Sequence, residues 1–371
     1  MRILQTPARF FPYSGGVENY VYYSSRELSR RGHRVSIVCA DEPPVGSGSV
    51  DDIKVKRLSY LGKLSNTNIT PALAPLLLRE DPDIIHTHLP TPWSSDISAV
   101  ISLLKNKPLF LTYHNDISGK GLFGLASGLY NISALRLLLA AARAIFITHS
   151  GYLENSLFLR GFRDKLIVSP PGVDFDKFKP LHYDREKCAT LFFVSRLDGY
   201  HHYKGLDLLL ESVEKISRDG AIRLYVAGEG ELLGYYRKAA RGRGLEGKVC
   251  FLGALDSNRL AEYYNRADIT VMPSLSSRQE GFGLAALEAM ACAKPVVVSS
   301  VAGVAREVRD RRCGLVAGAG NVSELTQAIS YLLRNPQARS EMGGNAYELV
   351  REKYSWSKHA DIVEKEYLRA I

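Results

Sequence analysis

Cysteine is scarce in this sequence of 371 residues, and its five cysteines are scattered, odd in number and without a C-x-x-C pair. This pattern argues against a disulfide framework and against a cysteine-based zinc site. The N-terminus also lacks the apolar core of a secretory signal, because Met1 and Arg2 lead directly into the short β-type run Ile3–Thr6. We therefore expect a reduced, cytoplasmic protein.

No uncharged run is long enough to suggest a helix that spans a bilayer. The longest apolar region lies around Gly121–Ile147, and its uncharged part, Gly121–Leu135, has fifteen residues and is interrupted by Gly124, Gly128 and Asn131. A spanning helix needs about 20 apolar residues. The pattern favours a buried helix, and the alternative is an interfacial segment that touches lipid.

Two further signatures are missing. The sequence contains no G-x-x-x-x-G-K-[ST] loop, which disfavours a P-loop kinase or NTPase. No nucleic-acid-binding motif accompanies the net charge of +9, so we expect no nucleic-acid partner. The positive excess is uneven: residues 1–180 carry 21 Lys and Arg against 15 Asp and Glu, and residues 181–371 carry 27 against 24. A basic first half can attract phosphate groups or the anionic cytoplasmic face of a membrane.

Short apolar or β-branched runs alternate with helical patterns along the chain, which is typical of parallel sheets with crossover helices. A chain of this length exceeds one hydrophobic core. The pattern breaks near Pro170-Pro171-Gly172 and Lys179-Pro180, so we predict an α/β protein with two Rossmann-like domains, residues 1–178 and 179–355. The expected strands are Arg2–Thr6, Arg34–Cys39, Ile84–His86, Leu109–Tyr113, Ala144–Thr148, Lys165–Ser169, Leu191–Ser195, Ile222–Ala227, Val249–Leu252, Ile269–Met272 and Pro295–Ser299.

Ligands of open α/β sheets bind outside the carboxyl ends of the strands. Polar or glycine-rich clusters follow the predicted strands at these places: Ser14-Gly15-Gly16, His86-Thr87-His88, His114-Asn115, Ser195-Arg196, Gly228-Glu229-Gly230 and Ser274–Gly283. We expect the two rows of strand ends to face each other across one cleft.

The most informative segment begins at Glu280. Glu280 and Glu288 flank a glycine turn with seven residues between them, and a helix is expected to begin near Gly283 and Leu284. The N–H groups and positive dipole end of a helix N-terminus suit a diphosphate. Gly281 and Gly283 let the backbone approach a ligand, and the carboxylates can accept hydrogen bonds from hydroxyl groups. The alternative is a surface loop followed by a helix with a solvated glutamate.

With these residues in place, the chain resembles the family-4 retaining glycosyltransferases, which have the GT-B fold of two facing Rossmann-like domains. Glu280–Ala291 resembles their E-x7-E motif, and Tyr354-Ser355-Trp356 resembles the start of their terminal helix, which implies that residues 356–371 cross back to the first domain. The other similar segments are Phe11–Glu18, Ser169–Asp174, Ser195–Leu197 with Lys204-Gly205, and Lys294–Val298.

The resemblance implies a role for each matching residue of the donor site. Arg196 and Lys204 would bind the donor diphosphate and neutralise charge on the leaving group. Glu280 would hold the transferred sugar, and Glu288 the ribose hydroxyls. The segment Gly281-Phe282-Gly283-Leu284 would line the donor, with the amides of Gly283 and Leu284 on the distal phosphate.

The resemblance also assigns residues outside this segment. Gly15 and Gly16 would let the first domain close on the phosphates, and His114 would lie beside the anomeric centre or the sugar's C6 hydroxyl. Backbone around Gly253 and Leu255 would recognise the base. One departure is visible, because seven residues separate Arg196 from Lys204, a longer interval than we expect in the family. The added segment Gly199–His202 could form a lip over the donor.

Two metal-like patterns are assigned to structural roles. Asp174-Phe175-Asp176 resembles the D-x-D of another transferase fold, but it follows a Pro-Pro-Gly turn and favours a turn or cap. His86 and His88 lack a third ligand at metal spacing, so strand-end packing or an acceptor-site role is favoured over metal binding. We thus expect no metal and no cofactor besides the nucleotide diphosphate sugar as co-substrate.

These features predict a retaining, metal-independent hexosyltransferase that uses a GDP- or UDP-sugar and a glycan or lipid-linked acceptor. Same-face attack with a phosphate oxygen taking the acceptor proton is the favoured route, because no carboxylate stands out as a covalent nucleophile. Two alternatives stay open. One is a nucleotide-sugar 2-epimerase of the same architecture, and the other is a non-catalytic nucleotide-sugar-binding protein.

Overall fold

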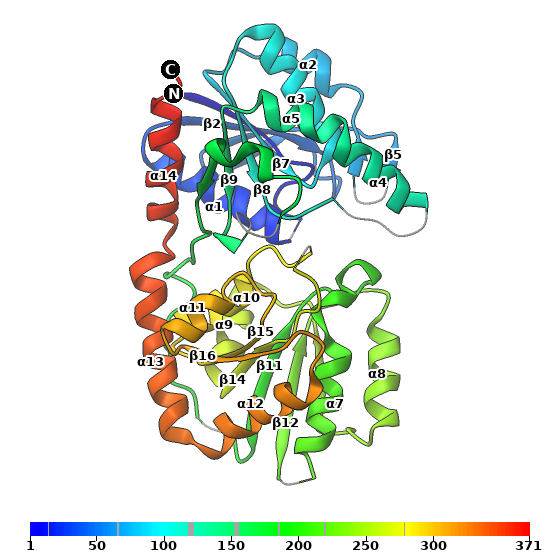
Figure 1. The fold of residues 1–371 in the computed structure, drawn as a ribbon, viewed down its shortest axis with the longest axis vertical. Coiled ribbons are helices and arrows are strands. Elements are labelled where there is room, and N and C mark those ends of the chain that lie inside the picture. Colours follow the sequence, from blue (N-terminus) through cyan, green and yellow to red (C-terminus); the bar gives the residue numbers. More distant parts are fainter. Residues whose placement is uncertain are drawn as a thin grey trace. The chain divides into compact units, whose positions relative to one another are not determined.

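The protein was analysed as a computed structural model that describes residues 1–13, 15–64, 67–117, 122–151, 156–184, 186–218, 220–277 and 279–371, and the side chains of these except Leu122 and Phe123. The chain forms two compact units (Figure 1). Unit 1 comprises Met1–Gly172 together with Trp356–Ile371, and unit 2 comprises Val173–Ser355. We placed the domain boundary after residue 178, whereas the observed division falls after Gly172 because Val173 and Phe178 pack in the core of unit 2.

Unit 1 is built on an eight-stranded sheet in the order β10-β9-β8-β7-β1-β2-β4-β3, in which only the β3–β4 pair is antiparallel. β7 lies at its centre and is buried along its whole length. Strands β5 (Gly62–Leu64) and β6 (Thr67–Ile69) form a separate pair. The sheet strands are β1 Arg2–Thr6, β2 Arg34–Ala40, β3 Gly48–Val50, β4 Ile53–Leu58, β7 Ile84–Leu89, β8 Leu109–Tyr113, β9 Ala144–Ile147 and β10 Leu166–Val168.

Helices cover both faces of this sheet (Figure 1). α1 and α14 pack together on one face, and α2, α3 and α5 lie on the other, with α4 beside α5. A period of two along each strand therefore sends alternate side chains to these two helix layers. The bounds are α1 Gly16–Arg30, α2 Leu73–Arg79, α3 Pro92–Lys105, α4 Leu122–Ile132, α5 Ala134–Ala141, η1 Arg160–Lys165 and α14 Trp356–Leu368.

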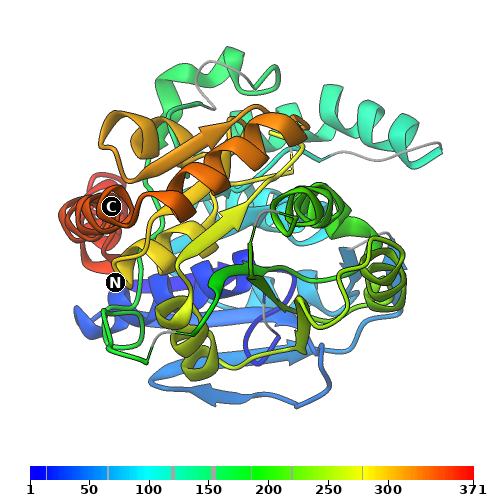
Figure 2. The same cartoon turned by 90° about the horizontal axis from the view of Figure 1, so that it is seen from below.

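Unit 2 contains a six-stranded, fully parallel sheet in the order β13-β12-β11-β14-β15-β16. Its strands are β11 Ala189–Val194, β12 Ile222–Ala227, β13 Val249–Gly253, β14 Ile269–Met272, β15 Val296–Ser299 and β16 Gly314–Ala317. The 90° view in Figure 2 shows its helices on both sides of the sheet. They are η2 Gly199–Lys204, α7 Leu206–Ile216, α8 Leu233–Gly242, α9 Ser257–Arg266, α10 Leu284–Ala291, α11 Ala305–Asp310, α12 Val322–Arg334 and α13 Pro336–Lys353.

Helix α7 illustrates how the sequence produces this packing. Leu206, Leu209, Leu210 and Val213 recur at helical spacing and are all buried in one core cluster. This apolar stripe fixes one side of the helix against the sheet. Its N-terminus begins after Gly205, whose φ of +76° is left-handed and suits glycine.

The observed strands confirm every strand that we predicted, within one to three residues at the ends. Five short or edge strands, β3 to β6 and β16, were not predicted, and β3 and β4 enlarge the first sheet beyond the six strands predicted for the first domain. The prediction of a buried helix over Gly121–Leu135 was wrong for its described part. Leu125, Leu129 and Ile132 lie on the exposed side of α4, at 66–74% exposure.

Candidate active site

In unit 2 the loops after β11, β12 and β14 approach one another at glycines. Gly228 has a φ of +132°, and a Cβ added there would lie 1.7 Å from the Ser195 carbonyl oxygen. At Gly205 an added Cβ would lie 2.2 Å from the Pro273 carbonyl oxygen. Only glycine allows these approaches. The close approach of Gly228 to Ser195 thus holds the segment that carries Arg196 in place.

Arg196 follows β11 and is half-exposed, and its Nε donates to Asp198 Oδ2 at 2.9 Å. Asp198 caps η2, since its Oδ1 accepts from the backbone and ring nitrogens of His201 at 3.0 Å and 2.7 Å. Burial would raise the pKa of Asp198, but the hydrogen bonds from His201 and Arg196 outweigh it and lower that pKa. The longer interval between Arg196 and Lys204 therefore contains a helical turn whose N-terminus is capped by the Asp198 carboxylate.

Lys204 ends η2, and its Nζ donates to Glu280 Oε2 at 2.7 Å. Ser274 Oγ donates to the same oxygen at 2.6 Å, and the Glu280 side chain is only 3% exposed. Burial alone would lower the pKa of Lys204, but the Glu280 carboxylate raises it well above its ordinary value. The two predicted donor-site residues, 76 positions apart in sequence, are thus brought together as a charged pair.

Gly283 is the residue before α10, with a φ of +110°, and a Cβ there would lie 2.5 Å from Met272 Cε. Leu284 is the first helical residue, so the N-terminus of α10 begins where we predicted it. Gly281 is half-buried beside it. Phe282 differs from expectation in one respect: its side chain is buried in the unit 2 core against Tyr354, so only its backbone can face a ligand.

Glu288 lies on α10, where Tyr264 from α9 donates its hydroxyl to Glu288 Oε2 at 2.8 Å. Burial raises the pKa of Glu288 to about 7, although the Tyr264 hydrogen bond lowers it. A carboxyl group with this pKa changes charge near neutral pH. Tyr264 also fixes where the second oxygen of Glu288 can point.

The predicted base-binding segment lies at the end of β13. Gly253 has a φ of +73°, and its carbonyl accepts from Gly228 N at 2.7 Å. Leu255 is half-buried and packs against the main core cluster of unit 2. The strand ends of β12 and β13 are therefore tied together beside the Arg196 loop.

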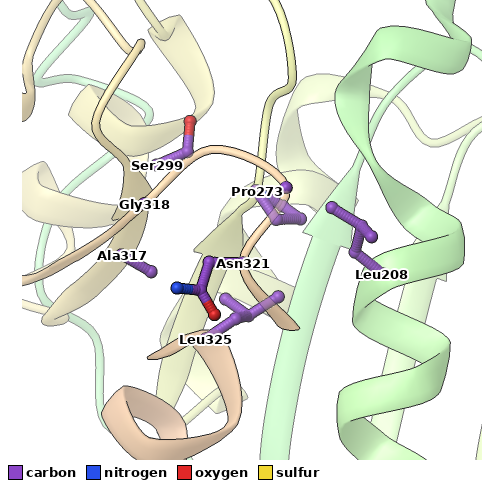
Figure 3. A pocket seen from close by; sticks show the side chains of 8 residues that line it. Leu208, Pro273, Ser299, Ala317, Gly318, Asn321 and Leu325 are labelled. Carbon is purple, nitrogen blue, oxygen red and sulfur yellow. The ribbon is translucent and has the colours of Figure 1, made fainter. Parts of the chain in front are cut away.

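A small pocket lies at the ends of β14, β15 and β16 (Figure 3). It is lined by Leu208, Pro273, Ser299, Ala317, Gly318, Gly320, Asn321 and Leu325. Among the described residues, the buried Ser299 Oγ has no hydrogen-bond partner. The backbone N–H of the neighbouring Gly318 donates to Glu324 at 2.6 Å. The loop after β16, which borders the pocket, is therefore held by a hydrogen bond.

In unit 1 the predicted glycine loop precedes α1. Gly15 is extended, and a Cβ added to it would lie 2.4 Å from Glu18 Oε2. Gly16 is the first residue of α1, and Ser14 lies outside the described residues. Glu18 Oε1 accepts from the buried Arg9 at 3.3 Å. The glycine thus lets an acidic side chain of the first helical turn fold back under the loop.

His114 directly follows β8 and is buried. Its Nε2 lies 3.4 Å from Nδ1 of His88, and the ring of Tyr20 meets it edge-on at 4.7 Å. Burial, with a smaller contribution from His359, lowers the pKa of His114 to about 3. His114 is therefore neutral at physiological pH.

The two other patterns have the structural roles that we favoured. His86 is buried and hydrogen-bonds Thr112 at 2.8 Å and the Tyr367 hydroxyl, and Asp174 accepts from the backbone of Asp176 at 3.1 Å in a turn. Across the described ranges, no group of three or more His, Cys, Asp or Glu side chains is arranged to hold a metal ion.

Sequence reasoning missed three residues that position this set, namely Asp198, Tyr264 and Gln5, and it named Ser274 only as the start of a polar cluster, without its bond to Glu280. Asp198 could have been found, because an acid two residues after an arginine at a strand end is a natural partner. Tyr264 on α9 and Gln5 on β1 lie far in sequence from their partners, and no local signal links them.

Two family models together match most of the chain. The model described as Glycosyltransferase Family 4 matches residues 14–177, and the model described as Glycosyl transferases group 1 matches residues 174–349. D-inositol 3-phosphate glycosyltransferase of Pseudarthrobacter chlorophenolicus is 29% identical over 78% of this chain and 71% of its own length. An uncharacterized glycosyltransferase of Methanocaldococcus jannaschii is 27% identical over 99% and 98%.

Solved structures share the fold at low identity. Sucrose-phosphate synthase from Thermosynechococcus elongatus has a TM-score of 0.80 at 20% identity and covers 99% of this chain and 98% of its own. Anabaena Alr3699/HepE, in complex with UDP, has a TM-score of 0.80 at 18% identity over the full length of both chains. The same Anabaena protein is also known in complex with UDP-glucose. The chain thus has the GT-B fold of glycosyltransferases.

Proposed function

Because the chain belongs to the family-4 glycosyltransferases, we propose that it transfers a hexose-type sugar from a GDP- or UDP-sugar to a glycan or lipid-linked acceptor, with retention of configuration. The observation that carries this proposal is that charged side chains form ion pairs at the carboxyl ends of the strands of unit 2. Arg196 and Lys204 lie on the loop after β11, and the α10 N-terminus follows Glu280.

This arrangement suits a diphosphate leaving group. Departure of a nucleoside diphosphate builds negative charge on phosphate oxygens, and preorganised cations and helix amides stabilise such charge. A charge-assisted hydrogen bond contributes about 1.5–3 kcal/mol. Lys204 would exchange part of its bond to Glu280 for the phosphate, which releases Glu280 to accept from sugar hydroxyls. We therefore propose that the reaction needs no metal ion, and that Glu288 and the backbone at Gly253 and Leu255 hold the nucleoside.

In unit 1 we propose that the neutral His114 contacts the transferred sugar and that Gly15 and Gly16 approach the donor phosphates. Attack on the same face as the departing phosphate gives retention. The complexes of the Anabaena neighbour with UDP and UDP-glucose support a nucleotide-sugar donor, and we include GDP-sugars because the sequence at Gly253 and Leu255 does not specify the base.

The first test is a thermal-shift screen of nucleotide sugars. A donor at 100 times its Kd should stabilise the folded protein by about 2.7 kcal/mol. With the selected donor, proton NMR of the product should show the anomeric configuration of the donor. Transfer should persist in EDTA. A product of inverted configuration would contradict retention, and loss of activity in EDTA that Mn²⁺ or Mg²⁺ restores would contradict metal independence.

We further propose that unit 1 meets an anionic membrane through α3, α4 and α5. These helices contact one another on one face of the sheet (Figure 1). They expose seven aliphatic side chains at 56–74%, which we call the apolar surface of unit 1: Val100, Leu103, Leu104, Leu125, Leu129, Ile132 and Leu137. So many aliphatic side chains on neighbouring helices are unusual for a face in contact only with water.

The charge around the apolar surface matches an anionic bilayer. Residues 92–151 hold five Lys and Arg but only two acidic residues, Asp96 and Asp116, which accept from the hydroxyls of Tyr130 and Tyr113. Each basic residue near an anionic surface contributes up to about 1 kcal/mol, and salt screens it. No single helix in the described parts of the chain meets the length and hydropathy of a membrane span, while Gly124–Ile132 and Ala134–Ala141 meet it only as a bent pair.

Flotation with vesicles tests this contact. We expect binding to vesicles that contain phosphatidylserine, weaker binding at high salt, and loss of binding in Leu125→Asp with Leu129→Asp. The control is Leu61→Asp, because Leu61 is 84% exposed and lies outside the apolar surface. Leu122 and Phe123, which the uncharged run also suggests as targets, have side chains outside the described residues. Equal flotation of all variants, or none with any vesicle, would overturn the membrane contact.

A further inference from the structure

We infer that Gln5 and His88 are positioning residues that fix the tautomer and the orientation of His114 through a buried hydrogen-bond chain. The inference deepens the proposed function. Only its predicted effect on catalysis rests on that function. Its structural content is independent of any substrate, because all members of the chain lie within unit 1.

The chain crosses three adjacent strands and one helix. Gln5 on β1 donates from Nε2 to Ser25 Oγ on α1 at 3.0 Å. His88 on β7 places Nε2 at 2.7 Å from Gln5 Oε1, and its Nδ1 lies 3.4 Å from Nε2 of His114. Strand pairing brings the members into register, since β1 and β8 both pair with β7. All of these side chains point to the α1 face of the sheet.

The direction of each bond follows from the first one. Because the Gln5 amide nitrogen donates to Ser25, its oxygen faces His88 and must accept. His88 therefore carries its proton on Nε2, and a neutral imidazole then has its lone pair on Nδ1. His114 must supply the proton for the remaining contact, so it is protonated on Nε2. The lone pair of His114 consequently resides on Nδ1, and a hydrogen bond at that atom is one that His114 accepts.

The surroundings keep both rings neutral and oriented. Burial lowers the pKa of His88 well below its ordinary value and that of His114 to about 3, so neither ring offers a second proton near neutral pH. The two rings are stacked, with 5.6 Å between their centroids and 23° between their planes. The rings of Tyr20 and His114 pack in a T-shaped arrangement, with an angle of 88° between their planes.

Chemically, this chain makes His114 an acceptor at Nδ1 toward a donor such as a sugar hydroxyl. The other tautomer would present an N–H at the same atom, and a neutral ring with a depressed pKa is a poor general acid. The chain thus selects one of two functions for the same side chain, as backbone or carboxylate partners do for other functional histidines.

The neighbouring His86 provides an internal comparison. It stacks on His88 at 4.7 Å, but its two nitrogens bond to Thr112 and Tyr367, not to the chain. A change at Gln5 should therefore leave the tautomer of His86 as it is.

NMR on the substrate-free full chain, labelled with 15N-histidine, reads the tautomers directly. We expect both His88 and His114 to be Nε2-protonated and neutral from pH 6 to 8. In Gln5→Leu, which keeps the size of the side chain and removes the acceptor, the signals of His88 and His114 should shift toward the other tautomer while His86 stays unchanged. Thr6→Val is the matched control, because Thr6 is the next residue of β1 and bonds to Ser98 on the opposite face at 2.8 Å.

Kinetics with the selected donor form the second arm. We expect kcat to fall about tenfold in Gln5→Leu and less than twofold in Thr6→Val, with nucleoside diphosphate affinity within twofold of wild type in both. His88→Asn retains an acceptor oxygen near the Nδ1 position and should keep most of the activity that His88→Leu loses.

A wild-type His114 protonated on Nδ1 would overturn the inference, even where a variant fails to fold. Unchanged tautomers in Gln5→Leu, or equal activity of His88→Asn and His88→Leu, would do the same. Absence of transfer in the wild-type protein would instead refute the proposed function and leave the tautomer measurement to decide the positioning chain.

Discussion

The candidate side chains at the strand ends of the two units differ in charge, although unit 1 also holds a charged pair, Arg9 and Glu18, beside its glycine loop. In unit 2 the side chains are charged and paired, with Arg196 on Asp198 and Lys204 on Glu280. In unit 1 the corresponding strand ends carry His88 and His114, which are buried, neutral and bonded to uncharged partners.

Under the proposed function, this difference would let one Rossmann-like scaffold serve two kinds of ligand group. Fixed positive charge suits a diphosphate, because a phosphate oxygen can take the place of the carboxylate that pairs with each cation in the free protein. Neutral donors and acceptors suit hydroxyl groups, which carry no charge to neutralise. The comparison therefore predicts that unit 2 variants disturb nucleotide chemistry, whereas unit 1 variants disturb sugar recognition without a change in charge.

The largest expected effect concerns the charged side chains of unit 2. Arg196→Ala should lower kcat/KM for the donor about 1,000-fold, because one cation that would neutralise the leaving phosphates is lost. Arg196→Lys should recover little, since an ammonium cannot reproduce the guanidinium fork. Steady-state kinetics decides this. Arg218→Ala, at an exposed arginine of the same unit that pairs with Glu214, is the control, and near-normal turnover of Arg196→Ala would remove Arg196 from the site.

The next effect separates sugar from nucleotide within unit 2. Glu280→Gln should lower kcat about 100-fold, because a neutral amide holds both Lys204 and the sugar hydroxyls less strongly. Its affinity for the bare nucleoside diphosphate should stay near normal. Calorimetry with the diphosphate, together with turnover, measures both. A large loss of diphosphate affinity at unchanged kcat would assign Glu280 to the nucleotide instead.

Glu288→Gln should act in the reverse sense, with about tenfold weaker binding of the nucleoside diphosphate and a smaller change in kcat. Tyr264→Phe should produce part of the same loss, because it removes the hydroxyl that orients Glu288. The same calorimetry applies. Equal weakening by Glu280→Gln and Glu288→Gln would show that the two roles are not divided as proposed.

The smallest effect is a pH dependence that distinguishes the units. Burial raises the pKa of Glu288 to about 7, and ribose hydroxyls donate to the ionised form. Diphosphate affinity should therefore rise several-fold as the pH increases from 6 to 8 and the carboxyl loses its proton. Glu288→Gln should abolish this component. His114, with a pKa near 3, should add nothing in this range, and a pH response that survives Glu288→Gln but disappears in His114→Gln would reverse the comparison.

The sequence allowed the fold to be predicted because its β-type and helical patterns alternate clearly. Strands such as Leu109–Tyr113 are short, apolar and followed by polar residues. The short strands Gly48–Val50 and Gly62–Leu64 lack this signal, since they lie in polar, glycine-containing segments at a sheet edge or in a separate hairpin. The run at 121–135 misled because apolar composition does not distinguish an exposed helix face from a buried one.

The candidate site likewise combines residues that local motifs indicate with contacts that only the fold creates. Glu280, Glu288 and Arg196 could be named as candidates from the sequence because each belongs to a local motif that begins at a strand end. The bond from Tyr264 to Glu288 and that from Gln5 to His88 depend on which helix and which strand become neighbours. That information arises only from the strand order and register of each sheet.

Release of nucleoside diphosphate from the nucleotide sugar tests the central claim most directly. With donor and acceptor present, the wild-type protein should release one diphosphate for each sugar transferred, and Arg196→Ala should release almost none. Formation of the C2 epimer of the donor sugar without any acceptor would favour a nucleotide-sugar 2-epimerase. A protein that binds the donor tightly but releases no diphosphate with any acceptor class would be a nucleotide-sugar-binding protein, and either result would contradict glycosyl transfer as the function.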